Sequence, residues 1–298
     1  MKTMKSKFYS LALAAGMLTL TACSDDNTND SNNDKGNGIE NGSILKGTIT
    51  EDVTLKAGNT YKLSGEYIVE AGATLNIEEG VKIISVYDNI VDYILVKQGA
   101  KINAVGTPDK PIVMTSEKEE PGAWGGIHIC GKAHTNAEGG KGSSEIGGAV
   151  YGGNDDADNS GTLQYIRLEY TGFAFDEEHE ANGISFYGVG NGTIVDHCEA
   201  YKGSDDGFEF FGGSVNVSNM VVVSCSDDSF DWTEGWNGKG TDLVAYQEAK
   251  ATLGYDCDCL IEADNNENDN AATPVSHPVL KNLILAGNGE SKQGIRLR

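Results

Sequence analysis

The feature that most constrains the fold of this chain is internal repetition. Residues 69–77 match residues 96–104, 27 positions later, with a turn glycine in each copy at Gly72 and Gly99. In the second half, the pattern at 183–186 recurs at 207–210 and 229–232, after steps of 24 and 22 residues. Units of this length with short alternating strands and no helical periodicity predict a β-solenoid. Leucine-rich repeats have a similar period, but their leucine spacing and recurrent asparagine are missing.

Composition supports an all-β fold. Glycine accounts for 39 of the 298 residues. This argues against a helical bundle, because a glycine inside a helix costs about 1 kcal/mol relative to alanine. The formal net charge is -23. A body this acidic repels phosphate backbones, so no nucleic-acid partner is expected.

The N-terminus has the features of a secretory signal. Lysines precede an apolar run at 8–20 that is too short to anchor the chain across a bilayer. Residues 20–23, Leu-Thr-Ala-Cys, resemble the lipobox of bacterial lipoproteins. The resemblance implies a signal peptide at 1–22 and a lipidated Cys23 as the first mature residue. An ordinary signal peptide with a stray cysteine is the alternative.

Residues 23–43 are predicted to be the lipidated cysteine and a flexible tether. After Cys23 the segment is almost entirely Ser, Asp, Asn, Gly, Thr and Lys, which cannot bury enough apolar surface to fold. Its beginning, Ser24-Asp25-Asp26, is similar to the export signal of surface lipoproteins in the Bacteroides group. We therefore expect an outer-membrane protein, held by a lipid anchor and facing the cell exterior.

The five cysteines beyond Cys23 are an odd number, so they cannot all form disulfides within one chain. Cys198 and Cys225 lie in apolar β-rich sequence and are expected to be small buried hydrophobes. The pair Cys257 and Cys259 offers half of a zinc site. No second Cys or His pair has suitable spacing, which argues against zinc.

Residues 44–298 resemble the right-handed parallel β-helix of the pectin-lyase-like superfold, and more closely secreted β-helix lipoproteins of the Bacteroides group. The similar segments are 69–77, 123–127, 205–213 and 261–266. The resemblance implies an all-β fold, a right-handed parallel β-helix (β-solenoid) in a single elongated domain at 44–298. It implies no particular activity.

Two stretches break the repeat, at 132–161 and 249–278, and both are rich in loop-forming residues. In a solenoid such insertions emerge as loops on one side, often over the binding face. The sequence stops at 294–298 in what resembles the middle of a strand. A solenoid needs a cap over its last coil. We therefore expect either a longer natural protein or a partner that covers this end.

Side chains alternate along each repeated strand, so one set should point into the coil and the other outward. Adjacent coils lie about 4.8 Å apart, which makes outward residues of neighbouring coils close neighbours. Two carboxylates at that distance repel by roughly 1 kcal/mol in water. A cation, an arginine or a shared proton should relieve the repulsion.

The outward ladder is predicted to be Ser185, Glu209, Asp231, Glu262 and Arg296. The inward set is Ile184, Phe186, Phe208, Phe210, Phe230, Trp232, Ile261 and Ile295.

Acidic turns flank this ladder. They offer clustered oxygen ligands, which suit calcium better than magnesium because calcium tolerates irregular shells of about 6 to 8 oxygens. The alternative is that the aspartates are ordinary turn residues that hydrogen-bond nearby backbone amides. The predicted calcium ligands are Asp205, Asp206, Asp227 and Asp228. Asp264 lies at a further turn beside the ladder.

Trp236 lies in a predicted loop just past the ladder. It is the best candidate in the chain for stacking on a sugar ring. The histidines are scattered and are expected to have structural or surface roles: His128, His134, His179, His197 and His277.

The superfold includes polygalacturonases, whose aspartates on consecutive coils protonate the leaving oxygen and activate water. Asp205-Asp206 is similar to their Asp-Asp motif, and 296–298 looks like their basic strand. The resemblance makes Asp205, Asp206, Asp228 and Arg296 the catalytic candidates. Two positions depart from the pattern. Asn182 replaces an aspartate, and Asp228-Ser229 replaces Gly-His-Gly, which argues against that hydrolysis.

The leading hypothesis is a non-enzymatic, surface-exposed lipoprotein whose acidic face binds an extracellular polysaccharide or a surface protein. The ligand-binding residues would be Glu209, Asp231, Trp236 and Glu262. The alternative is a carbohydrate-active enzyme, either a glycoside hydrolase or a polysaccharide lyase. A lyase would need calcium and a basic residue, and Arg296 is the only base on the ladder. A third hypothesis is adhesion to host or neighbouring cells, and the same sequence features are expected for it.

Overall fold

The computed structural model describes residues 38–88, 90–174, 180–290 and 292–298. The predicted signal peptide, Cys23 and most of the predicted tether lie outside these residues. Within them, none of the helices has both the length and the apolar character needed to cross a membrane. Contacts between residues define Gly36–Arg298 as one compact unit.

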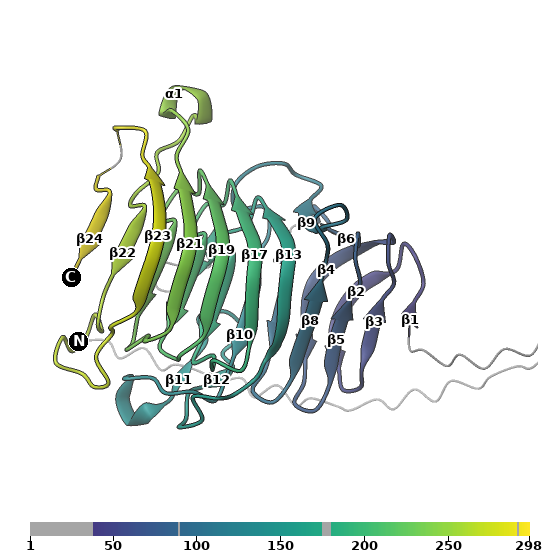
Figure 1. The fold of residues 1–298 in the computed structure, drawn as a ribbon. Helices are drawn as coiled ribbons and strands as arrows, with labels where there is room; N and C mark the ends of the chain where they lie inside the picture. The colour runs from purple at the N-terminus through teal and green to yellow at the C-terminus, as the bar shows by residue number, and fades with distance from the viewer. Residues whose placement is uncertain (1–37, 89, 175–179, 291) are drawn as a thin grey trace, which may run out of the picture. The chain divides into compact units, whose positions relative to one another are not determined.

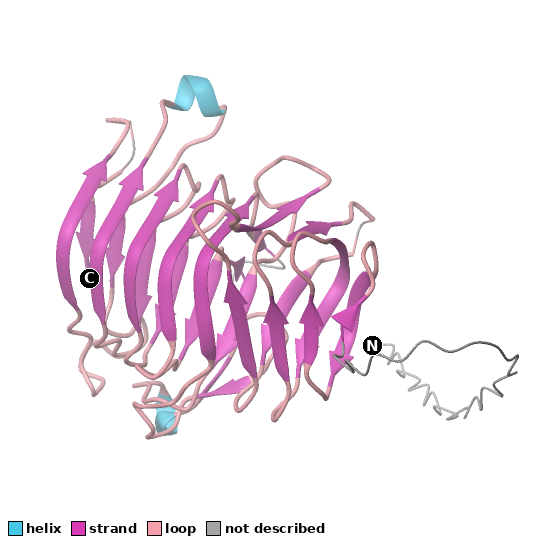
Figure 2. Ribbon diagram, turned by 45° about the vertical axis from the view of Figure 1, so that its right-hand side comes forward, coloured by secondary structure: helices cyan, strands magenta, loops and turns pink. Residues whose placement is uncertain are grey.

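The described residues form a right-handed parallel β-helix, in which strands from successive coils lie side by side (Figures 1 and 2). Twenty of the strands belong to one sheet that winds through the coils. Two small antiparallel pairs lie outside it, β11 (Gly142–Ser143) with β12 (Val150–Tyr151) and β14 (Phe173–Ala174) with β15 (Glu180–Ala181). The predicted fold class is therefore confirmed.

The strands stack in rows because equivalent segments of successive coils pair in register. The row that carries the predicted ladder, here called the site row, ends in a series of very short strands. It comprises β2 (Ile44–Ile49), β4 (Thr60–Val69), β7 (Tyr93–Val96), β10 (Ile127–Cys130), β16 (Ile184–Tyr187), β18 (Phe208–Phe211), β20 (Phe230–Thr233), β22 (Ile261–Ala263) and β24 (Ile295–Leu297).

Two further rows complete each coil. The third row includes β6 (Lys82–Ser85) and β9 (Ile112–Ser116), and it merges with the second row into single long strands from β13 onward. The second row comprises β1 (Gly38–Ile39), β3 (Val53–Leu55), β5 (Thr74–Ile77), β8 (Lys101–Val105), β13 (Gly161–Glu169), β17 (Ile194–Tyr201), β19 (Asn216–Val223), β21 (Lys239–Tyr246) and β23 (Val279–Ala286).

Each long strand contains a bend at one residue with positive φ. Asparagine, aspartate and histidine accept this conformation more readily than most side chains. His197 is one of these bend residues, and its ring stacks on Tyr165 of the previous coil at a centroid distance of 4.4 Å. The expected structural role of this histidine is therefore confirmed. The bend residues are Tyr165, His197, Asn219, Asp242 and Asn282.

The core lies inside the coils and includes stacked aromatic rings. The rings of Phe186 and Phe210 lie 5.1 Å apart, and those of Phe208 and Phe230 lie 5.9 Å apart. The predicted inward residues from β16 to β22 are all buried. Ile295, on the last described strand, is 52% exposed although its register matches the inward series.

The first insertion covers part of the outward face of the site row. Its strands β11 and β12 follow a 3-10 turn at Glu138–Gly140. Its residues Ile146, Ala149 and Tyr151 pack on Tyr187 and Phe211 in a second apolar cluster outside the coil. The insertion therefore emerges as a loop on one side of the coil, over the face that carries the predicted ladder.

The second insertion is divided by β22. The segment before this strand contains α1 (Lys250–Leu253), and the segment at 264–278 follows it, so the two lie at opposite ends of β22 (Figure 1). The later segment meets the first insertion through hydrogen bonds to Asn136. The prediction that 249–278 forms loops on one side was therefore wrong for its first part, because β22 completes a coil inside it.

Candidate functional site

The predicted ladder exists. Parallel pairing places Ser185 beside Glu209 and Glu209 beside Asp231. Strand β22 continues the row, with Phe230 beside Ile261, and β24 places Arg296 beside Glu262. The alternation of side chains thus brings carboxyls from three successive coils together on one face.

The ladder forms the wall of a partly enclosed acidic cavity rather than an open face. This acidic cavity has a volume of about 210 Å³. Its position explains why Glu262 is buried and Glu209 and Asp231 are only partly exposed. The residues that line it are Glu145, Glu209, Phe211, Asp231, Thr233, Glu234, Glu262, Asp264, Asn266, Glu267, Asn268 and Arg298.

Hydrogen bonds join the two insertions into one rim over the acidic cavity. The side-chain amide of Asn136 donates to the carbonyl oxygens of Asn265 and Pro274, both at 3.0 Å. Asn266 returns a hydrogen bond to Asn136 Oδ1 at 2.9 Å. Glu234 accepts hydrogen bonds from Thr135 and Tyr151 of the first insertion. The rim is therefore held by polar contacts that span both insertions.

The aspartates at the turns link successive coils. Asp206 Oδ1 accepts a hydrogen bond from the backbone N–H of Asp228 at 2.9 Å. One coil later, Asp228 Oδ1 accepts the backbone N–H of Cys259 at 2.5 Å, and one coil earlier Asn182 Oδ1 accepts the N–H of Asp206. The expected turn hydrogen bonds are present, and they reach the next coil instead of the same turn.

The predicted site residues form four groups in which one ligand atom per residue lies within 4.8 Å of the others. Asp205, Asp206 and Asp227 form the first group, so three of the four predicted calcium ligands lie together. Asp228 belongs to other groups. The remaining groups are Asp206 with Glu209 and Asp231, Asp228 with Asp231 and Glu262, and Asp228 with Asp258 and Cys259.

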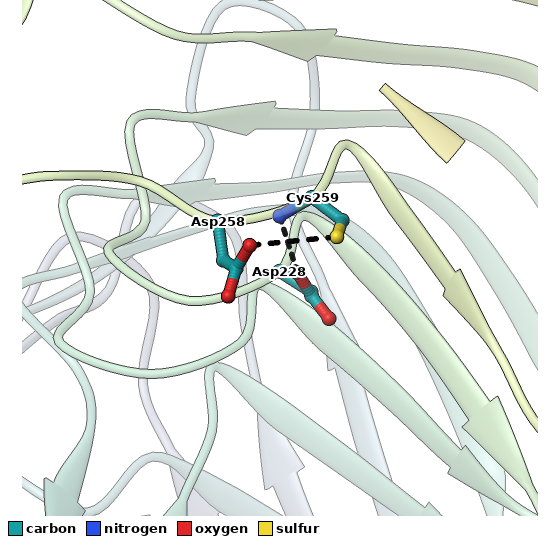
Figure 3. A group of neighbouring side chains, drawn as sticks. All are labelled: Asp228, Asp258 and Cys259. Carbon is teal, nitrogen blue, oxygen red and sulfur yellow. Dashed lines mark hydrogen bonds between the residues drawn. The ribbon is translucent and has the colours of Figure 1, made fainter. Parts of the chain in front are cut away.

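Figure 3 shows the last of these groups at the turn before β22. Cys259 directs its backbone N–H toward Asp228, and its thiol lies 3.5 Å from Asp258 Oδ1. Cys257 is not part of this group. Burial raises the pKa of Cys259 to about 12, so the thiol stays protonated at neutral pH. The five cysteines in the described residues are free and buried, as expected for Cys198 and Cys225.

Burial raises the pKa values of the ladder carboxyls. It is the main cause for Asp231, whose pKa rises to about 7, and the negative charge of Glu262 adds to the effect. Burial also raises the pKa of Glu209 well above its ordinary value, with Glu145 and Asp231 as charged neighbours. Asn182 opposes this shift by donating a 2.6 Å hydrogen bond to Glu209 Oε2. Protons are thus retained on the ladder near neutral pH.

The turn aspartates behave in the same way. Burial is the main cause that raises the pKa of Asp205 to about 8 and that of Asp228 to about 9. For Asp228, the charge of Asp227 and a hydrogen bond with Glu262 raise the pKa further. The repulsion expected between neighbouring acids is therefore relieved in part by retained and shared protons.

Arginine relieves the repulsion at the far end of the ladder. Arg296 Nη1 lies 2.9 Å from Glu262 Oε1. Arg298 Nε donates a 2.6 Å hydrogen bond to the same oxygen, and its guanidinium also contacts Oε2. Arg296 is therefore a partner of Glu262, and it is Arg298 that lines the acidic cavity. Glu262 was predicted to face a ligand, and it is engaged by these two arginines.

The prediction that Trp236 stacks on a sugar was wrong. Trp236 is 1% exposed, and its ring stacks on Phe210 at a centroid distance of 4.2 Å. Its indole N–H donates to the carbonyl oxygen of Val215. The loop folds back into the coil, so Trp236 is a core residue.

Several residues of the acidic cavity were missed by sequence reasoning. Arg298 had a detectable signal, because it stands two positions after Arg296 and therefore shares its side of a strand. Glu145 and Asn266 lie in insertions outside the repeat, where no periodic pattern indicates which way a side chain points. Glu234 follows β20 directly and was overlooked.

A family model described as a pectate-lyase like beta helix domain matches residues 47–298. No curated protein sequence gives a significant match to the chain. The family match agrees with the coil architecture described above.

Proposed function

The chain belongs to the family of pectate-lyase-like β-helix domains, and from this premise we propose that it binds an extracellular glycan in the acidic cavity. The observation that carries the proposal is the convergence of Glu209, Asp231 and Glu262 from three coils on one partly enclosed space of about 210 Å³. Concave sites with a few converging polar groups are the usual places for small ligands. The volume suits one unit of a larger chain.

The rim supports the same proposal. Side chains placed by insertions on a rigid coil are well suited to recognition, because the scaffold fixes them in advance. Asn266 and Asn268 offer amide groups to sugar hydroxyls beside the acids of the wall. Trp236 is buried and cannot stack on a sugar ring, so we expect the glycan to be recognised through hydrogen bonds.

We further propose that calcium binds at the first acidic group, Asp205, Asp206 and Asp227. Two members of this group, Asp205 and Asp227, line a neighbouring cavity of about 300 Å³. Its lining adds the hydroxyls of Ser204 and Ser226, the carboxyls of Asp256 and Asp258, and the ammonium group of Lys292. Hydroxyl and carboxylate oxygens suit calcium, which needs about 6 to 8 of them. The ion would neutralise the charge behind the acidic cavity.

Calcium is expected to raise the melting temperature of the full chain. A ligand that binds only the folded state stabilises it by about 2.7 kcal/mol at a hundredfold excess over its Kd. The double variant Asp205→Asn with Asp227→Asn should lose this shift while staying folded. The matched control changes two exposed acids elsewhere, Asp109→Asn with Glu119→Gln, and should keep it. Equal shifts in both double variants, or no shift in the wild type, would count against the site.

Glycoside hydrolysis is a second candidate function, favoured by one observation. Burial raises the pKa of Asp231 to about 7, and this carboxyl lies close to Glu262, which forms ion pairs with Arg296 and Arg298. A proton donor beside a carboxylate is the pairing that hydrolysis of a glycosidic bond requires. A lyase is less well supported, because Arg298, the base among the described lining residues, is bound to Glu262.

A glycan array tests both candidates when it scores retention and new chain ends together. The purified full chain should retain at least one glycan class. Glu209→Gln and Asp231→Asn should weaken that binding about tenfold or more, since each replaces a buried carboxyl that can hydrogen-bond the ligand. The control Asp109→Asn should bind as the wild type does. Retention without new ends supports binding alone, new reducing ends support hydrolysis, and unsaturated ends support a lyase. No retention of any glycan would refute the proposal.

We propose that the protein is a lipoprotein of the outer membrane, anchored through Cys23 and facing the exterior. The basis is the lipobox-like sequence at 20–23 and the polar tract that follows it. Cys23→Ser should move the protein from the membrane fraction to the soluble fraction. A protease added to whole cells should digest the wild type. Unchanged fractionation of Cys23→Ser would contradict lipid anchoring.

A further inference from the structure

The acidic cavity carries an excess of negative groups that its own residues do not balance. Seven of the described residues that line it are acids, and one, Arg298, is a base. That base is already engaged by Glu262, as is Arg296. An anionic polysaccharide would therefore meet repulsion at this wall, even where single carboxyls retain protons.

One oxygen in the wall of the acidic cavity lacks a partner. Asp231 Oδ1 is buried and receives no hydrogen bond from the described residues. Its neighbours differ in this respect. Glu209 accepts a hydrogen bond from Asn182, Glu234 from Thr135 and Tyr151, and Glu262 from Arg298. A buried acceptor without a donor is costly, so this atom marks the point where a ligand donor would be held most strongly.

We propose that Asp231 receives the ammonium group of an amino sugar, so that the glycan bound here carries free amines. This inference rests on the proposed glycan-binding function and names the ligand class. An ammonium group is compact and has three N–H donors. Asp206, Glu209 and Asp231 each have an acceptor atom within 4.8 Å of the others, and two of them, Glu209 and Asp231, line the acidic cavity, where they can accept hydrogen bonds from one nitrogen.

Other occupants fit this point of the cavity less well. A uronic acid would place a carboxylate against acids. Calcium needs about 6 to 8 oxygens. Two of the three carboxyls at this group already accept hydrogen bonds, Asp206 from the N–H of Asp228 and Glu209 from Asn182. A neutral sugar hydroxyl could donate to Asp231, but it would bring no charge to balance the wall. The ammonium group supplies both the donor and the charge.

The test compares three oligosaccharides of equal length by calorimetry at physiological ionic strength, where distant surface charges are screened. The probes are a β-1,4-linked glucosamine tetramer, its fully N-acetylated counterpart and a galacturonic acid tetramer. The full chain should bind the glucosamine tetramer about tenfold to a hundredfold more tightly than the N-acetylated one, because acetylation removes a charge-assisted hydrogen bond. Binding of the galacturonate tetramer should be weakest.

Variants separate a specific contact from bulk charge. Asp231→Asn should remove most of the preference for the free amine, whereas Asp109→Asn, with the same change in net charge, should keep it. If Asp231→Asn does not fold, Glu209→Gln serves as the second variant and should also reduce the preference. Equal affinity for the amine and acetyl forms, or equal losses in Asp231→Asn and Asp109→Asn, would overturn the inference. Tight binding of the acetylated tetramer would overturn the amino-sugar inference but would still support glycan binding. If no probe and no arrayed glycan binds, both the inference and the proposed glycan-binding function are refuted.

Discussion

The protein should melt at a higher temperature at about pH 5 than at about pH 8. The cause is the set of buried carboxyls whose pKa values rise on folding, to about 7 for Asp231, about 8 for Asp205 and about 9 for Asp228. The folded state therefore binds protons that the unfolded state releases near pH 4. Such groups contribute stability that is complete below the unfolded pKa and is lost as the pH rises through the folded pKa.

The expected effect is large. One pKa unit corresponds to about 1.4 kcal/mol, so deprotonation of Asp231 alone should lower the free energy of unfolding by roughly 3 kcal/mol between about pH 5 and pH 8. For a domain of this size, that loss of unfolding free energy corresponds to a decrease of roughly 6 to 12 °C in melting temperature. Scanning calorimetry in calcium-free buffer across this range measures it directly.

Variants identify which carboxyls are responsible. Asp231→Asn should reduce the pH dependence by the share of Asp231, because an amide has no proton to lose, while Asp205 and Asp228 keep their contributions. Asp109→Asn, at an exposed position, should reproduce the wild-type curve. Stability that increases from about pH 5 to pH 8 would mean that these carboxyls are held charged in the folded state, which contradicts the account.

Trp236→Ala should destabilise the fold strongly. The side chain is 1% exposed, and its ring stacks on Phe210 at 4.2 Å and lies 5.7 Å from Trp232. Removal of a buried tryptophan costs about 3 to 5 kcal/mol, because it loses the burial and leaves a cavity. Denaturant unfolding followed by circular dichroism measures this change.

The control for Trp236→Ala is Tyr246→Ala, since Tyr246 is an aromatic residue that is 48% exposed. Its substitution should change the free energy of unfolding by no more than about 0.5 kcal/mol. A stable Trp236→Ala variant that had lost glycan binding would restore the sugar-stacking role and contradict the buried placement.

The repeat was enough to predict the coils and the ladder. Both follow from local rules: a fixed period stacks equivalent strands, and alternation assigns Glu209 and Asp231 to the outward side. The same rules place Phe208 and Phe210 in the core, where the structure has them. The periodic part of the sequence was therefore sufficient to predict most of the fold.

The position of Trp236 could not be predicted in this way, because it depends on a contact outside the repeat. The loop turns inward so closely that a Cβ atom on Gly238 would lie 1.9 Å from the carbonyl oxygen of Val215. Only glycine permits this approach. The sequence shows a glycine-rich loop, but the same composition is typical of an exposed one.

The acidic cavity was only partly predictable for a related reason. Its wall comes from the repeat, whereas its rim comes from two insertions that meet through Asn136 and Asn265 across 129 positions of sequence. The rim converts the expected open face into a partly enclosed site, and burial raises the pKa values of the ladder carboxyls. No local pattern at Glu145 or Asn266 indicates this meeting.

The most direct test of the central claim is a crystal structure of the full chain soaked with the glycan that it retains most tightly on the array. We expect a sugar unit inside the acidic cavity, within hydrogen-bonding distance of Asp231 and beside Glu209 and Asn268. A sugar bound elsewhere, for example in the open groove lined by Thr54, Asn76 and Asn103, with the acidic cavity left to solvent, would contradict it.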